Sequence, residues 1–225
     1  MRPKIRIAEP EGFSDAALRR LQTVADVRLE PCAPGALSNA LQETDVFWFR
    51  LGHRIDAEVL GERPRCRILA TPVTGLDHID LEACAARGVR VVSLKGEYEF
   101  LREVRATAEL AVGLALALLR HIPRAAADVL EGHWRRDRFR GRELYHKTAG
   151  IVGVGRLGGI VAEYLAALGM EVLGYDPRPD LPACVERVAT LDELFARCDL
   201  VSVHAVYQAD THHLIDAQVL AASRP

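Results

Sequence analysis

Short apolar runs alternate with helical patterns along the first hundred residues. The first strand is expected at residues 5–8, and Ser14 is placed to cap a helix whose apolar positions recur every three to four residues. Further strands are expected at residues 27–29, 46–49, 67–70 and 89–92, and a further helix at 80–87. This alternation with strongly apolar strands is typical of a parallel sheet covered by helices on both faces.

A long apolar helix separates this region from a second one. Residues 105–132 form the longest helical stretch, divided near Pro123, and its first half is apolar around most of its circumference. Such a helix must be buried on several sides, in a domain core or in a subunit interface. Its apolar run is much shorter than the roughly 20 residues of a membrane span, so we expect no contact with a membrane. We place one domain at residues 1–104 and another at 105–225.

The alternation resumes after a polar, arginine-rich segment at residues 134–147, which we interpret as a surface connection. The expected strands are 149–154, 172–175 and 200–203, and the expected helices are 156–168, 192–196 and one that begins near Asp216. The chain is therefore predicted to be an α/β protein with two parallel-sheet domains.

Composition and charge narrow the function classes. Of the 225 residues, 49% are hydrophobic, and 29 basic side chains face 31 acidic ones, which gives a formal charge of −2. These values exclude a disordered chain and a nucleic-acid binder that relies on bulk positive charge. The N-terminus lacks the apolar stretch and the cleavage site of a secretory signal, so the cytoplasm is the expected compartment. The five cysteines are scattered, with no C-x-x-C pair, which favours reduced, mostly buried thiols over disulfides or a metal site. They are Cys32, Cys66, Cys84, Cys184 and Cys198.

The most informative segment is the G-x-G-x-x-G pattern at residues 153–158, which joins an apolar strand to an amphipathic helix. Gly153 would allow the tight turn, Gly155 would let a pyrophosphate approach the backbone, and Gly158 would let helix and strand pack closely. The helix N-terminus offers N–H groups and a positive dipole end to the anion. Because glycine turns are common, the motif needs its context, and here the next strand ends on an acid, Asp176.

Asp176 is placed to accept hydrogen bonds from both hydroxyls of an adenosine ribose. It therefore favours NAD over NADP, whose 2′-phosphate it would repel. Arg178 stands two residues further on and could soften this preference by pairing with such a phosphate. The alternative is an ordinary strand-to-helix turn with an ordinary loop acid, which the agreement of strand, glycines, helix and acid makes the weaker interpretation.

Several stretches together resemble the D-isomer-specific 2-hydroxyacid dehydrogenase family, whose members include phosphoglycerate, glyoxylate and phosphite dehydrogenases. The matching stretches are residues 70–80, 105–111, 150–176, 198–204 and 209–215. The resemblance implies a flavodoxin-like substrate domain and an NAD-binding Rossmann domain, incomplete at its C-terminal end. It also implies an oxidoreductase that acts on a small 2-oxo or 2-hydroxy acid. The helix at 105–120 resembles the one through which the family forms homodimers.

The resemblance also implies roles for single residues in the substrate loop and near the nicotinamide. The loop at Thr74 and Gly75 would present backbone N–H groups to the substrate carboxylate, although a plain turn would look the same. Thr107 would contact the nicotinamide end, although a threonine can equally cap a helix.

Four further positions match residues that meet the cofactor in the family. Arg156 and Leu157 would meet the pyrophosphate through their backbones, and Arg156 could add a charge contact. His204 and Thr211 would line the cofactor cleft at the carboxyl end of their strand. A structural role for His204 is the commoner outcome for such a residue.

No catalytic residue is expected within this chain. The family uses an arginine, a glutamate and a histidine that would follow Pro225, so the resemblance implies a C-terminally truncated relative that is itself inactive. Its last strand, at 200–203, would then be an unpaired edge. Local histidines do not replace the missing one, because His78 is expected to begin a helix and His212 and His213 to lie on a solvated loop. The alternative to an enzyme is a non-catalytic, dimerising NAD-binding relative, comparable to the family's corepressors.

Overall fold

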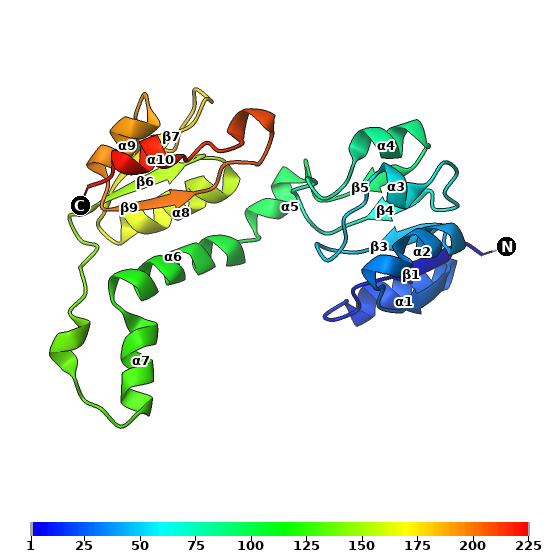
Figure 1. Cartoon of the computed structure of the whole chain (residues 1–225), viewed down its shortest axis with the longest axis horizontal. Coiled ribbons are helices and arrows are strands. Elements are labelled where there is room, and N and C mark those ends of the chain that lie inside the picture. Colours follow the sequence, from blue (N-terminus) through cyan, green and yellow to red (C-terminus); the bar gives the residue numbers. More distant parts are fainter. Residues whose placement is uncertain (1, 225) are drawn as a thin grey trace. The chain divides into compact units, whose positions relative to one another are not determined.

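The computed structural model describes residues 2–224, which divide between Leu101 and Arg102 into two compact units (Figure 1). The division lies within the short helix α5 (Tyr98–Arg102), close to the boundary expected at residue 104. Each unit contains its own parallel sheet, so the predicted α/β class with two sheets is confirmed.

The first unit is built on a five-stranded parallel sheet in the order β2-β1-β3-β4-β5, as in flavodoxin. Each strand is three or four residues long and lies where the apolar runs predicted one. The strands are β1 (Lys4–Ile7), β2 (Asp26–Leu29), β3 (Val46–Trp48), β4 (Ile68–Ala70) and β5 (Arg90–Val92).

Helices cover both faces of this sheet. On one face Ile5 and Ile7 pack beneath Leu18 and Leu21 of α1 (Asp15–Val24). On the other face Phe47 and Leu69 pack with residues of α2 (Leu37–Glu43), α3 (Ala57–Leu60) and α4 (Leu81–Ala86). A short 3-10 turn, η1 (Pro34–Ala36), leads into α2. The side chain of Ser14 caps α1 as predicted, by accepting the N–H of Ala17.

The second unit contains a four-stranded parallel sheet in the order β8-β7-β6-β9. The strands are β6 (Thr148–Val152), β7 (Glu171–Tyr175), β8 (Val185–Arg187) and β9 (Leu200–Val203). This is the 3-2-1-4 part of the Rossmann order. The pattern did not predict β8, because its three residues contain a single apolar side chain. Among the described residues β9 pairs with β6 alone, so it forms the sheet edge that the sequence predicts.

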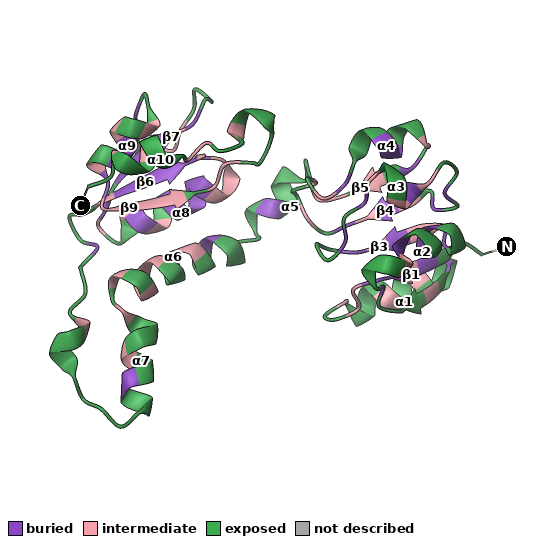
Figure 2. Cartoon of the chain, in the orientation of Figure 1, coloured by how far each residue is buried: buried purple, intermediate pink, exposed green. Residues whose placement is uncertain are grey.

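Two helices cover the two faces of the second sheet. Ile151 packs with Val161 and Leu165 of α8 (Arg156–Ala167), whereas Val152 packs with Leu194 of α9 (Leu191–Arg197). Figure 2 shows the buried residues gathered in β6 and on the inner side of α8. The unit also includes η3 (Ala209–Thr211) and α10 (Ala217–Ala221).

The apolar stretch forms two helices, α6 (Ala106–Leu119) and α7 (Ile122–Leu130), followed by the 3-10 turn η2 (Arg136–Phe139). Within residues 2–224, α6 is not buried on several sides, because it packs mainly against α8 and its leucines stay exposed. Ala108 is its one fully buried residue, whereas Leu110, Leu114 and Leu118 are 62%, 61% and 68% exposed. These three leucines, at a spacing of four residues, define what we call the leucine face of α6.

No single helix among residues 2–224 is long and apolar enough to cross a bilayer. The segments Tyr98–Leu119 and Ile122–Leu130 meet the length and composition criteria only as a pair, and they are bent by 63°.

All five cysteines are free, and four are buried, as the sequence predicts. Burial raises the pKa of the thiols of Cys66 and Cys198 to about 11. Cys184 is the exposed exception.

This difference predicts selective thiol labelling. With a disulfide reagent at pH 8, we expect one thiol per chain, Cys184, to react within minutes, and the other four to react only on unfolding. A thiol with a pKa of about 11 is only about 0.1% thiolate at that pH, and burial also blocks access. Rapid labelling that persists in the Cys184→Ser variant would contradict the burial of the other thiols.

Candidate nucleotide-binding site

The turn between β6 and α8 depends on the absence of a β-carbon at Gly153. This residue has φ of +84°, in the left-handed region that favours glycine. A Cβ here would lie 2.6 Å from the backbone nitrogen of Ala205, which follows β9. The Gly153 N–H donates to the carbonyl oxygen of Tyr175 over 2.9 Å. The turn is therefore packed between both neighbouring strands.

Gly158 and Gly155 have opposite surroundings. A Cβ on Gly158 would overlap the carbonyl oxygen of Gly153, so the first turn of α8 lies directly against the preceding loop. A Cβ on Gly155 would meet only Nη2 of Arg178, at 3.8 Å. One glycine allows close packing, and the other leaves the backbone open to a ligand.

The N-terminus of α8 is suited to an anion. Gly155 occupies the cap position and has no side chain to accept a first-turn N–H, and the first bond within the helix runs from Gly159 N to Gly155 O at 2.8 Å. A helix end of this kind combines N–H donors with the positive end of the helix dipole. Together with the open side of Gly155, it forms a cradle that fits the pyrophosphate of a dinucleotide.

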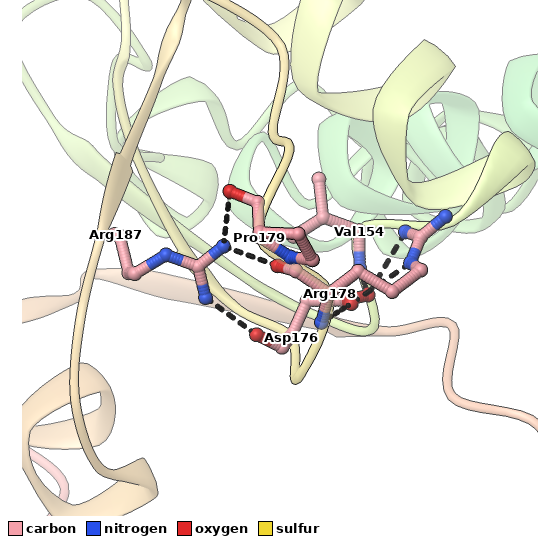
Figure 3. Close-up of polar contacts among 5 residues, drawn as sticks. All are labelled: Val154, Asp176, Arg178, Pro179 and Arg187. Carbon is pink, nitrogen blue, oxygen red and sulfur yellow. Dashed lines mark hydrogen bonds and ion pairs between the residues drawn. The ribbon is translucent and has the colours of Figure 1, made fainter.

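Asp176 follows β7 directly, and its side chain is only 6% exposed. Figure 3 shows its contacts with Val154 and Arg178. Its Oδ2 accepts the N–H of Val154 at 2.8 Å, which ties the end of β7 to the glycine turn. The Arg178 side chain donates to both carboxylate oxygens, from Nε to Oδ1 at 2.9 Å and from Nη2 to Oδ2 at 3.0 Å. The Arg178 N–H also donates to Oδ1, at 2.9 Å.

These contacts control the charge of Asp176. Burial opposes its ionisation, but the hydrogen bonds from Arg178 and from the Val154 N–H outweigh burial and hold the pKa of the carboxyl below its usual value. Asp176 therefore remains a carboxylate throughout the neutral range.

A second arginine supports the same loop from behind. Nη1 of Arg187, on β8, donates to the carbonyl oxygen of Asp176 at 2.6 Å (Figure 3). Its Nη2 donates to the carbonyl oxygens of Arg178 and Pro179, the latter at 3.1 Å. One guanidinium thus holds the carbonyl groups of three of the four residues in the 176–179 loop. Sequence reasoning missed Arg187, because nothing local distinguishes it from the many other arginines.

His204 lies beside the glycine turn, where its N–H donates to the carbonyl oxygen of Val152 at 2.7 Å. Its ring Nε2 shares a hydrogen bond of 2.9 Å with the hydroxyl of Ser202. Burial lowers the pKa of this imidazole, so His204 is a neutral side chain at pH 7. Thr211 instead closes the loop after β9, by donating to the carbonyl oxygen of Val206 at 2.6 Å and accepting the N–H of Gln208 at 2.8 Å.

The other predicted cofactor residues lie around the start of α6 and α8. Nη1 of Arg156 donates to the carbonyl oxygen of Val104 at 3.1 Å, and Leu157 packs into the apolar cluster around α8. Thr107 is exposed in the first turn of α6. The cap position of α6 is Arg105, so Thr107 is not the helix cap that the sequence left as an alternative.

The predicted substrate residues, Thr74 and Gly75, belong to the first unit. Both are exposed and lie in the loop between β4 and α4. His78, in the same loop, precedes the cap of α4 rather than beginning the helix.

One group of potential metal ligands occurs within residues 2–224, and it comprises Asp128, Glu131 and His133. Arg135 occupies both carboxylate oxygens of Asp128, with Nε at 3.1 Å from Oδ2 and Nη2 in contact with Oδ1. A cation would have to displace this guanidinium, so the cluster is better explained as an ion-pair network that closes the end of α7.

Comparison with known proteins agrees with this geometry. Residues 112–225 match the model of a family described as D-isomer specific 2-hydroxyacid dehydrogenase, NAD binding domain. The match covers β6, the glycine turn, α8 and Asp176, so the second unit is an NAD-binding domain of this kind.

Relatives extend the similarity over most of the chain. A D-3-phosphoglycerate dehydrogenase of Mycobacterium tuberculosis is 39% identical over 83% of this chain, and the chain spans 35% of that protein. A hydroxypyruvate reductase of Thermotoga maritima is 31% identical over 98% of this chain and 70% of its own length. Among solved structures, the D-lactate dehydrogenase from Aquifex aeolicus complexed with NAD and lactic acid gives a TM-score of 0.82 at 26% identity. That match covers 98% of this chain and 66% of the other.

Two glycine substitutions provide a matched test of the turn. We expect Gly153→Ala to lower the free energy of unfolding by about 3 kcal/mol, because φ is positive and the added methyl would collide with the backbone after β9. We expect Gly155→Ala to change it by less than about 0.5 kcal/mol, because its φ is ordinary and its side is open. Urea denaturation followed by circular dichroism measures both values. Equal destabilisation by the two variants would contradict this account of the turn.

Proposed function

We propose that this chain, which belongs to the D-isomer specific 2-hydroxyacid dehydrogenase family, is part of an NAD-dependent oxidoreductase that acts on the CH–OH group of a D-2-hydroxy acid. The observation that carries the proposal is the glycine turn, with a buried, ionised Asp176 at the end of the neighbouring strand. NAD, when bound, supplies the nicotinamide carbon that exchanges a hydride with the substrate.

The predicted cofactor residues of the second unit each have a role in this proposal. The N-terminus of α8, including the backbone of Arg156 and Leu157, would hold the pyrophosphate, and Asp176 would accept the ribose hydroxyls. Thr107 would lie at the nicotinamide end. His204 and Thr211 would shape the cleft beside β9 rather than move protons, because their polar groups already bond to neighbours.

The first unit would supply part of the substrate site. The loop at Thr74 and Gly75 is exposed, and its backbone N–H groups would bind the carboxylate of a 2-oxo acid. We assign no catalytic residue within residues 1–225, since the family's arginine, glutamate and histidine have no counterpart here. The 225-residue chain by itself is therefore proposed to bind NAD without turnover. The alternative is a non-catalytic, NAD-binding relative.

We expect the 225-residue chain to bind NADH, as measured by fluorescence titration, and Asp176→Ala to weaken binding at least about tenfold, because hydrogen bonds from the ribose to a charged acceptor are lost. Asp180→Ala is the matched control, because Asp180 is an exposed acid in the same loop. Oxidation of NADH by glyoxylate or hydroxypyruvate should be absent with this chain. Turnover would contradict the lack of catalytic residues, and unchanged affinity in Asp176→Ala would contradict the cofactor assignment.

The intact mass of the protein made by its source organism separates the enzyme from the non-catalytic alternative. A mass well above 24.8 kDa favours the enzyme, with catalytic residues elsewhere in the protein. A mass near 24.8 kDa favours the binding-only relative.

We also propose a homodimer formed through the leucine face of α6. The three leucines are more than 60% exposed and form one continuous stripe, and such a stripe is costly to leave in water. A second copy would present the same stripe around a two-fold axis. The free cysteines further support a cytoplasmic location, which stays a proposal.

The dimer can be tested with a charge placed in the leucine face. We expect the chain to sediment as a dimer at about 20 μM, and Leu114→Glu to sediment as a monomer, because burying an unpaired carboxylate costs several kcal/mol. Leu51→Glu is the control, because Leu51 is similarly exposed, at 68% against 61% for Leu114, but lies in the first unit. A monomeric parent chain, or a dimer that survives Leu114→Glu, would refute this interface.

A further inference from the structure

The carboxylate of Asp176 has no free acceptor position in this structure. It accepts four hydrogen bonds, two on each oxygen, from the N–H groups of Val154 and Arg178 and from Nε and Nη2 of Arg178. A carboxylate offers about four lone-pair sites in all. A ribose that donates two hydroxyl protons to Asp176 must therefore displace two of the present donors.

The two backbone donors cannot be the ones that leave. The Val154 N–H is fixed by the packed glycine turn, and the Arg178 N–H belongs to a loop whose carbonyl groups are held by Arg187. The Arg178 side chain is free to move, because it is 54% exposed and its Nη2 lies beside the open side of Gly155, 3.8 Å from where a Cβ would stand. The ribose and this guanidinium thus compete for the same two positions.

A 2′-phosphate would not have to displace the Arg178 side chain from Asp176. The bonds to Asp176 use two of the five N–H groups of the guanidinium, so three remain to donate to an anion. A phosphate at the ribose 2′ position could bind Arg178 while the guanidinium still shields the charge of Asp176.

We infer that Arg178 is a specificity-determining residue that competes with the ribose diol of NAD for Asp176 and serves as the binding group for a 2′-phosphate. The inference rests on the proposed function, since it concerns the same dinucleotide site. Its consequence is that Arg178 narrows the difference in affinity between the two cofactors. NAD binding opens the Asp176–Arg178 pair, whereas NADP binding retains it. Arg187 is a positioning residue, because it fixes the backbone from which Arg178 swings.

The test is the dissociation constant of NADH and of NADPH, measured by isothermal titration calorimetry on the 225-residue chain and on Arg178→Gln. We expect Arg178→Gln to bind NADH about three- to fivefold more tightly, because the competitor is gone. We expect it to bind NADPH at least about tenfold more weakly, because the cation is gone and Asp176 repels the phosphate. Arg197→Gln is the control for net charge, because Arg197 pairs with Glu186 and Glu193 away from this loop.

A second variant keeps the test decisive if Arg178→Gln does not fold. Arg178→Lys retains the charge but cannot bridge both oxygens of Asp176, so NADH should bind more tightly while NADPH stays within about threefold. If the parent chain binds neither cofactor, both the NAD assignment and this inference are wrong. If the parent binds NADH but Arg178→Gln leaves both constants within twofold, or weakens NADH binding, the inference is overturned and the NAD assignment stands.

Discussion

The close contact between backbone atoms after β6 is the constraint on which the second unit depends. Gly153 lies against the residues that follow β9, and Gly158 lies against the carbonyl group of Gly153, so two β-carbons are excluded within six residues. The N–H of Val154, between them, points at Asp176 and connects the turn to β7. The central strand, both of its neighbours and α8 therefore meet at one turn. A change that displaced this turn would disturb the core and the nucleotide site together, because both are built on the same backbone atoms.

The same turn explains how a nearly buried carboxylate is tolerated. Removing a carboxylate from water is costly unless hydrogen bonds replace hydration, and Asp176 has a full set of four. Two of these bonds come from rigid backbone and two from a mobile side chain. The backbone pair holds the acid in place for a ligand, and the side-chain pair satisfies it when no ligand is bound. The bonds from the Arg178 side chain thus stabilise the protein without a ligand but lower its affinity for a ribose that must displace them.

Sequence reasoning found what local patterns encode and missed what depends on distant pairing. The side chain of Ser14 and the glycines at 153–158 act on neighbours within a few residues, so their roles can be deduced from spacing. Strand β8 was missed because it is a short edge strand that exists through pairing with β7. Arg187, on that strand, was missed because nothing local distinguishes it from the other arginines. Asp176 and Arg178 were both identified, but spacing could not reveal that their bonds leave the carboxylate without a free acceptor position.

The helix α6 shows the same limit in packing. A segment that is apolar around most of its circumference must be covered on several sides, and this much follows from the sequence. The sequence does not show which surfaces cover α6, because an apolar pattern identifies the side chains to be buried and not their packing partners. In the structure Ala108 and Val112 face α8, whereas the leucine face, offset around the helix, stays exposed. The two sides lie at different angles around the helix. A charge in the leucine face can therefore disturb the proposed dimer interface and leave the packing of α6 on α8 intact. The near-uniform apolarity of α6 therefore encodes two surfaces, of which the chain itself uses one.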